Sequence, residues 1–499
     1  MAELKILPGT PDDDNREYLP EKIRFTDIVV NENGNNSIVY PKGLKEFKEV
    51  VINGVEDVWY EYVPESYDPN KKVPLIIGLH GGLMTGWGHA IYTSWTLVAE
   101  REGLICLFPN AHEKRMWANY GIFDDFDPAL APDLPIVIPT KDIKDNHDMN
   151  MILALIDKMK EKYNIDEGRI FMQGMSMGNL MTGQFAREYG DILAGAAGSG
   201  GPSELKNIFD PQGRIINKAG HLAIWQSRPE QNGLPPGKEY DEYTVNRMNR
   251  IYWMRLNECE LVPQISIIGE DNFAFYKGKK ADLVYLDIKN RDHGQTLDEA
   301  FLYWDYLFSG TRRNEDGTIT HEESKLPRCG DEFGVAVAEG FDKAWFKNKV
   351  VDLRTKAIQW DKLKYHGLNG DQVVRGSYLC VPISFLAQVF EADYHTVDNG
   401  ASVTLTLKDG RRLQFARGSI GCLIDDTLRC MYCEALHREN ELLISIEWFA
   451  KYFYGLTVTS CEGVTYITDH FADLSAFMAD LIKDLLGGNM VPDNYDGML

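Results

Sequence analysis

Residues 169–190, RIFMQGMSMGNLMTGQFAREYG, decide how the N-terminal part of this chain folds. RIFMQ reads as an apolar strand, and NLMTGQFAREYG follows it as an amphipathic helix. Between them, Gly174 to Gly178 spell G-M-S-M-G, and the two glycines allow a tight turn without Cβ clashes. The pattern predicts a strand–turn–helix unit that exposes Ser176 above a sheet.

The flanking sequence alternates strands with helices. VPLIIGLHGG (73–82) and LICLFPN (104–110) are continuous apolar runs, which suit strands buried on both faces of a parallel sheet. Helical spacing marks 94–103 and 148–166, and residues 23–63 read as N-terminal strands. This alternation, which continues to about residue 310, predicts an α/β fold with a mostly parallel central sheet.

Composition excludes several classes of partner. The 499 residues include 52 Lys and Arg against 75 Asp and Glu, a formal charge of −23 that repels phosphate backbones and anionic lipids. No apolar run approaches the ~18–20 residues of a membrane-spanning helix. The start, MAELKILPGTPDDDN, lacks signal-peptide features, which predicts a cytoplasmic protein or the mature form of a secreted one. We therefore expect no nucleic-acid or membrane partner, while a homo-oligomer is compatible with the sequence.

A serine nucleophile needs a base, and His293 is the predicted one. It stands in NRDHGQT, after the strand ADLVYLDI and before a helical stretch, where folds with this nucleophile turn place their histidine. His221 opens the strand HLAIWQ and is interpreted as an ordinary strand residue. The glycine pair after His80 ends another buried strand, where backbone N–H groups contribute to an oxyanion hole. We expect His80 itself to hydrogen-bond this loop.

The triad acid should follow the strand HLAIWQ, in SRPEQNGLPPGKEYDEY. Glu230 lies nearest the strand and is favoured, with Asp241 as the alternative and Glu242 further along. Asp292 is disfavoured because adjacent side chains, here those of Asp292 and His293, rarely point at each other.

Aromatic residues near the carboxyl ends of the strands are candidates for substrate binding. Ordinary packing is an equally good explanation for each of them. The candidates are Trp87, Trp117, Tyr120 and Trp225. Residues 121–140 form a long irregular insertion that suits a lid, and Asp148 is expected to cap the helix that follows.

Three stretches resemble the polyhydroxybutyrate-depolymerase/feruloyl-esterase branch of the α/β-hydrolases: VEDVWYEYVPESYDPNKKVPLIIGLHGG, LICLFPNAHEKRMWANYG and YNIDEGRIFMQGMSMGNLMT. The resemblance covers roughly residues 50–310. It implies an α/β-hydrolase fold with Ser176 as nucleophile and His293 as base. It also implies oxyanion donors at Met177 and at Gly82 or Leu83. Acyl transfer through a serine needs no metal or organic cofactor, so none is expected. WQSRPEQNG replaces the family's G-x-x-D-like acid loop, which leaves the choice of Glu230 open.

The C-terminal part differs in character. TRRNEDGTITHEESKLPRCGDEFG (311–334) is polar and turn-rich, as linkers are. Beyond it, VPISFLAQVF aligns with LISIEWFAKYF at an offset of 63 residues, and each copy predicts a strand entry, a helix and two strands joined by a glycine turn. These stretches resemble the copper amine oxidase N-terminal-like domain, an accessory module that is not itself a copper site. The expected organisation is an esterase domain over 1–310 (N-terminal strands within 1–55), a linker over 311–340, a smaller α+β repeat module over 341–470, and a helix and tail over 471–499.

Eight cysteines in the chain are too few for a disulfide scaffold. Cys430 and Cys433 form a C-x-x-C motif, but it lacks the spacing of a zinc site and the βαβ context of a redox pair. We interpret both as buried or free thiols.

Together these features predict a serine carboxylic-ester hydrolase acting on a small-molecule or polymer-linked ester. Feruloyl, acetyl and polyester substrates fit equally well, and the first two would place the protein in polysaccharide degradation. Two alternatives stay open: a peptidase or amidase of the same fold, and a carbohydrate- or cell-wall-binding protein with a degenerate hydrolase domain.

Overall fold

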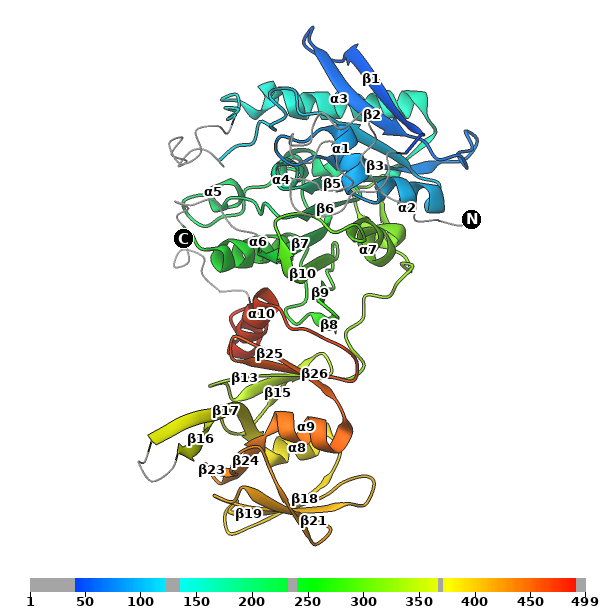
Figure 1. Cartoon of the computed structure of the whole chain (residues 1–499). Helices are drawn as coiled ribbons and strands as arrows, with labels where there is room; N and C mark the ends of the chain where they lie inside the picture. Colours follow the sequence, from blue (N-terminus) through cyan, green and yellow to red (C-terminus); the bar gives the residue numbers. More distant parts are fainter. Residues whose placement is uncertain (1–40, 122–134, 232–239, 367–370, 491–499) are drawn as a thin grey trace. The chain divides into compact units, whose positions relative to one another are not determined.

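The computed structural model describes residues 41–121, 135–231, 240–366 and 371–490. The chain divides into two units (Figure 1). Unit 1 contains the described residues of Met1–Leu261 and Phe275–Arg328, and unit 2 contains those of Val262–Ala274 and Cys329–Pro492. The predicted strands within 23–40 and most of the predicted lid lie outside the described residues.

Unit 1 is built on a large twisted sheet, whose strands are paired in the order β1-β2-β4-β3-β5-β6-β7-β10. Strands β3 to β7 and β10 pair in parallel, while β1 and β2 are antiparallel to their neighbours. The bounds are β1 (Leu44–Val50), β2 (Glu56–Tyr62), β3 (Val73–Leu79), β4 (Ile105–Pro109), β5 (Ile165–Met175), β6 (Gly195–Ser199), β7 (Ala223–Gln231) and β10 (Leu283–Asp292). Every residue of β3 and β4 is buried, as the unbroken apolar runs predicted. The mostly parallel α/β fold is therefore confirmed.

Helices connect these strands and pack around the sheet (Figure 1). They are α1 (Gly86–Tyr92), α2 (Trp95–Glu102), α3 (His147–Lys162), α4 (Met177–Tyr189), α5 (Leu205–Ile208), α6 (Glu242–Leu256) and α7 (Glu299–Leu302). The prediction that Asp148 caps α3 is wrong. Asn146 is the cap, because its side chain accepts the N–H of Met149 at 3.1 Å. Asp148 is buried in the first turn, where its carboxylate accepts the backbone N–H groups of His112 and Ala118.

The polar stretch 311–340 is shared between the two units. Its first part forms the hairpin β11 (Thr311–Arg313) and β12 (Ile319–His321) in unit 1. Arg312 fixes the hairpin through two hydrogen bonds to Asp166, 2.7 and 2.9 Å long. The last part of the stretch forms β13 (Gly334–Ala338) of unit 2. Specific ion pairing and strand pairing thus order much of a segment that composition alone marks as a linker.

Among the described residues from 329 onward, unit 2 forms three small sheets and three helices. The sheets have the orders β15-β14-β13-β26-β25, β16-β17-β24-β23 and β18-β19-β20-β21-β22. The first comprises β13, β14 (Lys343–Phe346), β15 (Lys349–Asp352), β25 (Thr457–Cys461) and β26 (Val464–Thr468). The second comprises β16 (Ile358–His366), β17 (Asp371–Pro382), β23 (Leu436–Arg438) and β24 (Glu441–Ser445). The third comprises β18 (Asp393–Val397), β19 (Ser402–Thr406), β20 (Arg412–Ala416), β21 (Gly421–Ile424) and β22 (Thr427–Cys430). Residues 262–274 contain β8 (Gln264–Ile268) and most of β9 (Asp271–Tyr276).

The two sequence repeats adopt the same local structure. Helices α8 (Ile383–Val389) and α9 (Ile446–Tyr454) begin 63 residues apart (446 − 383), and each is followed by a two-strand hairpin. The strands that enter these helices, β17 and β24, pair antiparallel with Val381 opposite Ile444. These two residues are also 63 apart (444 − 381), so the repeats are related by a local pseudo-two-fold axis at this pair.

The buried side chains of both repeats contribute to one core, including Phe385, Trp448 and Phe449. The last helix, α10, covers Ala476–Gly487, within the stretch 471–499 where a helix and tail were expected, and the Ser475 side chain caps it by accepting the N–H of Met478. No helix within the described ranges is long and apolar enough to cross a membrane.

Candidate active site

Ser176 occupies the predicted turn between β5 and α4. Its backbone has φ 54° and ψ −119°, a region that costs a non-glycine residue about 1–3 kcal/mol. The surrounding glycines make the turn possible. A Cβ on Gly174 would lie 2.2 Å from the carbonyl oxygen of Gly178, and one on Gly178 would lie 2.1 Å from that of Leu79. Both glycines of the motif are therefore required by close backbone packing under the serine.

His293 follows β10 and faces the serine. Its Nε2 atom lies 2.7 Å from Ser176 Oγ, the distance of a strong hydrogen bond. Burial lowers the pKa of His293, and the negative charge of Asp292 partly opposes this effect. At neutral pH the imidazole is therefore neutral, so Nε2 can accept the hydroxyl proton.

The loop that carries His293 is anchored by buried side chains. Ser199 Oγ donates to the carbonyl oxygen of Gly294 at 2.6 Å, and Tyr92 Oη accepts the N–H of Gln295 at 2.9 Å. The Gln295 side chain in turn accepts a hydrogen bond from Gln173, a residue of β5 close to the nucleophile. The histidine is thus fixed relative to the serine by contacts with β5, β6 and α1. No sequence spacing signals these anchors.

Gly82 and Met177, two of the three residues predicted to supply oxyanion N–H groups, are neighbours in the structure. A Cβ on Gly82 would lie 3.1 Å from Met177 Cγ, which places the two residues side by side. Neither N–H has a hydrogen-bond acceptor within the described ranges. The third candidate, Leu83, differs because its N–H already donates to the carbonyl oxygen of Arg115 at 2.8 Å.

His80 supports this turn, as the sequence suggested. Its Nε2 atom accepts the N–H of Ala111 at 2.9 Å, so the proton lies on Nδ1, which donates to the Gly81 carbonyl oxygen at 2.6 Å. Burial lowers the pKa of His80 to about 4, which keeps the ring neutral. The neutral ring therefore bridges the turn after β3 and the loop after β4.

The two candidate acids occupy different positions. Glu230 lies near the end of β7, and its Oε2 atom accepts the backbone N–H of Asn290 at 3.2 Å, close in sequence to His293. Asp241 is the N-cap of α6, where its carboxylate accepts the N–H of Thr244 at 2.7 Å. Residues 232–239 of the same loop lie outside the described part of the chain.

The four aromatic candidates divide into two pairs. Trp117 and Trp225 are fully buried, and their indole N–H groups donate within the protein to His80 O and Ser227 Oγ. They offer no surface to a substrate. Trp87 and Tyr120 are partly exposed.

A second polar cluster was not found from the sequence. Asp57 in β2, His112 after β4 and His147 at the start of α3 bring three possible ligand atoms within 4.8 Å of one another. The two histidines are 35 positions apart (147 − 112), so no motif spacing reveals them.

The sheet order and the serine turn after β5 define an α/β-hydrolase fold. No family model matches the chain. Over 148 residues (30% of this chain, 18% of the relative) it is 26% identical to the bifunctional acetylxylan esterase/xylanase XynS20E of Neocallimastix patriciarum. Over 161 residues (32% and 48%) it is 29% identical to feruloyl esterase B of Thermothelomyces thermophilus. Over 145 residues (29% and 31%) it is 26% identical to poly(3-hydroxyalkanoate) depolymerase C of Paucimonas lemoignei. The chain thus spans less than half the length of each of these relatives.

Proposed function

We propose that unit 1 is a serine carboxylic-ester hydrolase. The observation that carries this proposal is the 2.7 Å contact between His293 Nε2 and Ser176 Oγ, on a serine held above the sheet by its turn. The three relatives named above support the same reaction class, because each name describes the cleavage of a carboxylic ester.

The reaction begins when His293 takes the Ser176 hydroxyl proton and Oγ attacks the ester carbonyl carbon. Negative charge develops on the carbonyl oxygen, and the N–H groups of Gly82 and Met177 stabilise it by hydrogen bonding. The protonated His293 then transfers its proton to the leaving alcohol. Water, deprotonated by the same imidazole, hydrolyses the acyl-enzyme and restores the serine.

Glu230 is the proposed carboxylate that orients His293 and stabilises its protonated form. Its support is positional, because Glu230 lies near the end of β7, and its partner Asn290 is three residues before the histidine (293 − 290). Asp241 is the less favoured candidate because its carboxylate is already used to cap α6.

For the substrate, we propose an acyl ester carried by a polymer or by a fragment of one. The relatives' names include acetyl and feruloyl esters and a polyester, so the three acyl classes are the ones to compare. Trp87 and Tyr120 are the aromatic residues proposed to contact the substrate, since both keep exposed surface.

The test compares Ser176→Ala with the wild type on p-nitrophenyl acetate. Loss of the nucleophile should lower kcat by about 10⁴-fold or more. Ser66→Ala, which removes an exposed hydroxyl elsewhere in unit 1, is the matched control and should retain full activity. Fluorophosphonate should label Ser176 alone. Near-normal turnover by Ser176→Ala, or labelling of another residue, would refute the proposal.

A substrate panel then assigns the acyl class. It should contain acetylated xylan, methyl ferulate and poly(3-hydroxybutyrate), each followed by release of its free acid. The preferred substrate is the one with the highest kcat/KM, and this activity must also disappear in Ser176→Ala.

We further propose that unit 2 is an accessory module of the copper amine oxidase N-terminal-like type. The support is the pair of repeats about the Val381–Ile444 axis, each with the predicted strand–helix–hairpin order. The matching test is retention of the full-length protein on insoluble xylan or cellulose. Substitution of Tyr452, a half-exposed ring on α9, should weaken retention without changing turnover of p-nitrophenyl acetate.

A further inference from the structure

The cluster of Asp57, His112 and His147 has the composition of a transition-metal site. Asp57 Oδ1 lies 2.9 Å from His112 Nδ1 and 2.9 Å from His147 Nε2. The two imidazole centroids are 4.1 Å apart, with an angle of 44° between the rings. Three segments distant in sequence thus bring two imidazole nitrogens to the same carboxylate oxygen.

The buried carboxyl group of Asp57 contacts no permanently charged partner among the described residues. Its side chain is fully buried, and within the described ranges its only ion-pair partners are the two histidines, which are uncharged unless protonated. Buried carboxylates are normally paired with a permanent charge or coordinate a metal. The second oxygen, Oδ2, is buried and has no hydrogen-bond partner among the described residues. The hydrogen bonds to the two histidines use only Oδ1 and leave that buried oxygen without a partner among the described residues.

The three ligand atoms have to move for an ion to enter. Zinc binds nitrogen and carboxylate oxygen at about 2.0–2.1 Å, so neighbouring ligand atoms around a tetrahedral ion lie about 3.3 Å apart. The two observed 2.9 Å separations would have to widen by roughly 0.4 Å, and the two ring nitrogens, which lie within 4.8 Å of each other, would have to reach a similar spacing. Two imidazoles and one carboxylate suit Zn²⁺ and related divalent ions, whereas Ca²⁺ and Mg²⁺ prefer sites built from oxygen.

The surroundings hold the ligands in place. Asp148 accepts the backbone N–H of His112 at 2.9 Å, and Asn146 caps the helix that starts at His147. Asn53 lies with its side-chain amide 3.4 Å from His147 Nδ1. The atom that faces Nδ1 is the Asn53 amide nitrogen, so an ion at Nε2 requires the amide to turn, after which its oxygen would accept the Nδ1 proton.

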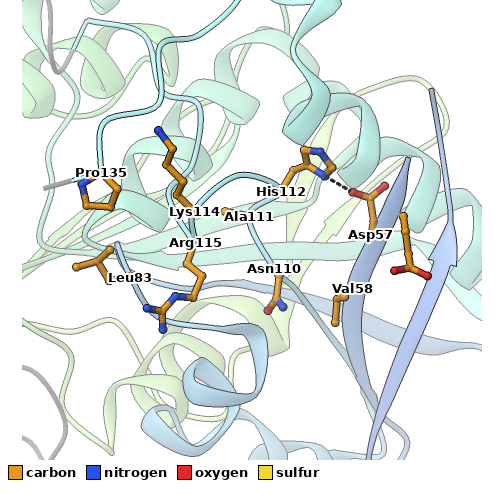
Figure 2. Close-up of a pocket in the computed structure, with 10 residues that line it drawn as sticks. Asp57, Val58, Leu83, Asn110, Ala111, His112, Lys114, Arg115 and Pro135 are labelled. Carbon is orange, nitrogen blue, oxygen red and sulfur yellow. Dashed lines mark hydrogen bonds and ion pairs between the residues drawn. The ribbon is translucent and has the colours of Figure 1, made fainter. Parts of the chain in front are cut away.

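A pocket of about 380 Å³ adjoins the cluster, and Asp57 and His112 are among its lining residues. Figure 2 shows the His112 ring turned toward Asp57, while Lys114 and Arg115 lie on the other side of the pocket. The pocket also reaches Leu83, in the turn beside the oxyanion site. A fourth ligand, water or a small anion, can therefore approach an ion from this side.

We propose that Asp57, His112 and His147 bind one divalent first-row transition-metal ion, of the Zn²⁺ class, with a further coordination position open to the pocket. The ion would tie β2, the loop after β4 and the start of α3 together. This inference is independent of the esterase proposal, since none of the three residues belongs to the Ser176 site.

The experiment uses the full-length protein without a polyhistidine tag, stripped with EDTA and desalted. Zn²⁺ is titrated in competition with a chromophoric chelator, and the melting temperature is measured with and without the ion. We expect one equivalent of Zn²⁺ to bind and to raise the melting temperature. His147→Gln and Asp57→Asn should each weaken binding at least tenfold and lose the thermal shift. His395→Gln, which removes an exposed histidine of unit 2, is the matched control and should behave as the wild type.

The chain also has eight cysteines, whose thiolates could bind the added ion instead. The absorption spectrum of bound Co²⁺ distinguishes the two kinds of ligand. Nitrogen and oxygen coordination gives visible d–d bands without the intense near-ultraviolet bands of cobalt thiolates. Melting of the metal-free variants close to that of the metal-free wild type shows that they are folded. The proposal is overturned if the wild type binds no Zn²⁺ in the titration, or if His147→Gln binds Zn²⁺ as tightly as the wild type. A cobalt spectrum dominated by thiolate bands would also overturn it.

Discussion

His293 Nε2 lies 2.7 Å from Ser176 Oγ, although 117 residues separate the two along the chain. The serine is held by its strained turn and the histidine by Ser199, Tyr92 and the Gln173–Gln295 pair. Because both partners are fixed before substrate arrives, little reorganisation is needed for proton transfer. The first prediction tests this pair directly.

The activity should persist to lower pH than an exposed histidine base would allow. Burial lowers the pKa of His293, and only the neutral ring accepts the serine proton. The midpoint of the acidic limb in the pH profile of kcat/KM should therefore lie below about pH 6.5. Hydrolysis of p-nitrophenyl acetate measured between pH 4.5 and 8 gives this value. In Asp292→Asn the limb should move further down, because the negative charge that raises the pKa is removed. A limb at or above pH 6.5 in the wild type would contradict the assignment.

The triad acid is tested by comparing Glu230→Gln with Asp241→Asn. If Glu230 orients the imidazole, the glutamine variant should lose about 10²–10⁴-fold in kcat while KM changes little. Asp241→Asn should keep kcat, since asparagine also caps helices well. Full activity of Glu230→Gln would instead transfer the role to another carboxylate of residues 232–242.

Gly178→Ala should destabilise the protein and abolish activity. The added Cβ would lie 2.1 Å from the Leu79 carbonyl oxygen, so the turn and the adjacent strand must separate. Gly190→Ala is the matched control. There the nearest atoms would be 3.5 Å away and φ is −66°, so alanine fits without strain. The melting temperatures of both variants and their turnover check this; equal melting temperatures would show that the turn has more room than these distances indicate.

Oxidation should join Cys433 to Cys380, not to Cys430. The Sγ atoms of Cys380 and Cys433 lie 3.6 Å apart in the interior of unit 2, whereas Cys430 is exposed. A mild oxidant such as diamide can therefore remove two electrons and two protons from the buried pair. Peptide mapping should find the 380–433 disulfide, and Cys430→Ser should form it equally well. A 430–433 disulfide as the main product would contradict the prediction.

Local sequence determined the conformation of the turn that carries Ser176. An apolar strand, two glycines around Ser176 and an amphipathic helix admit few backbone paths, so the turn and its exposed serine follow from neighbours along the chain. The repeats of unit 2 were also readable, since their helices start at Ile383 and Ile446, as the 63-residue offset required. The buried strands followed from their unbroken apolar runs.

The tertiary structure decided which distant groups meet. Trp117 and Trp225 match an exposed aromatic rim in sequence, yet their rings complete the core. Leu83 and Gly82 are equivalent candidates in sequence, but only the backbone path shows that the Leu83 N–H already donates to Arg115. The approach of Asp57, His112 and His147 likewise depends on the sheet order, which places β2 beside β4. Local patterns record the short-range sterics of a turn or a strand, whereas a hydrogen bond or an ion site between distant segments depends on packing of the whole sheet.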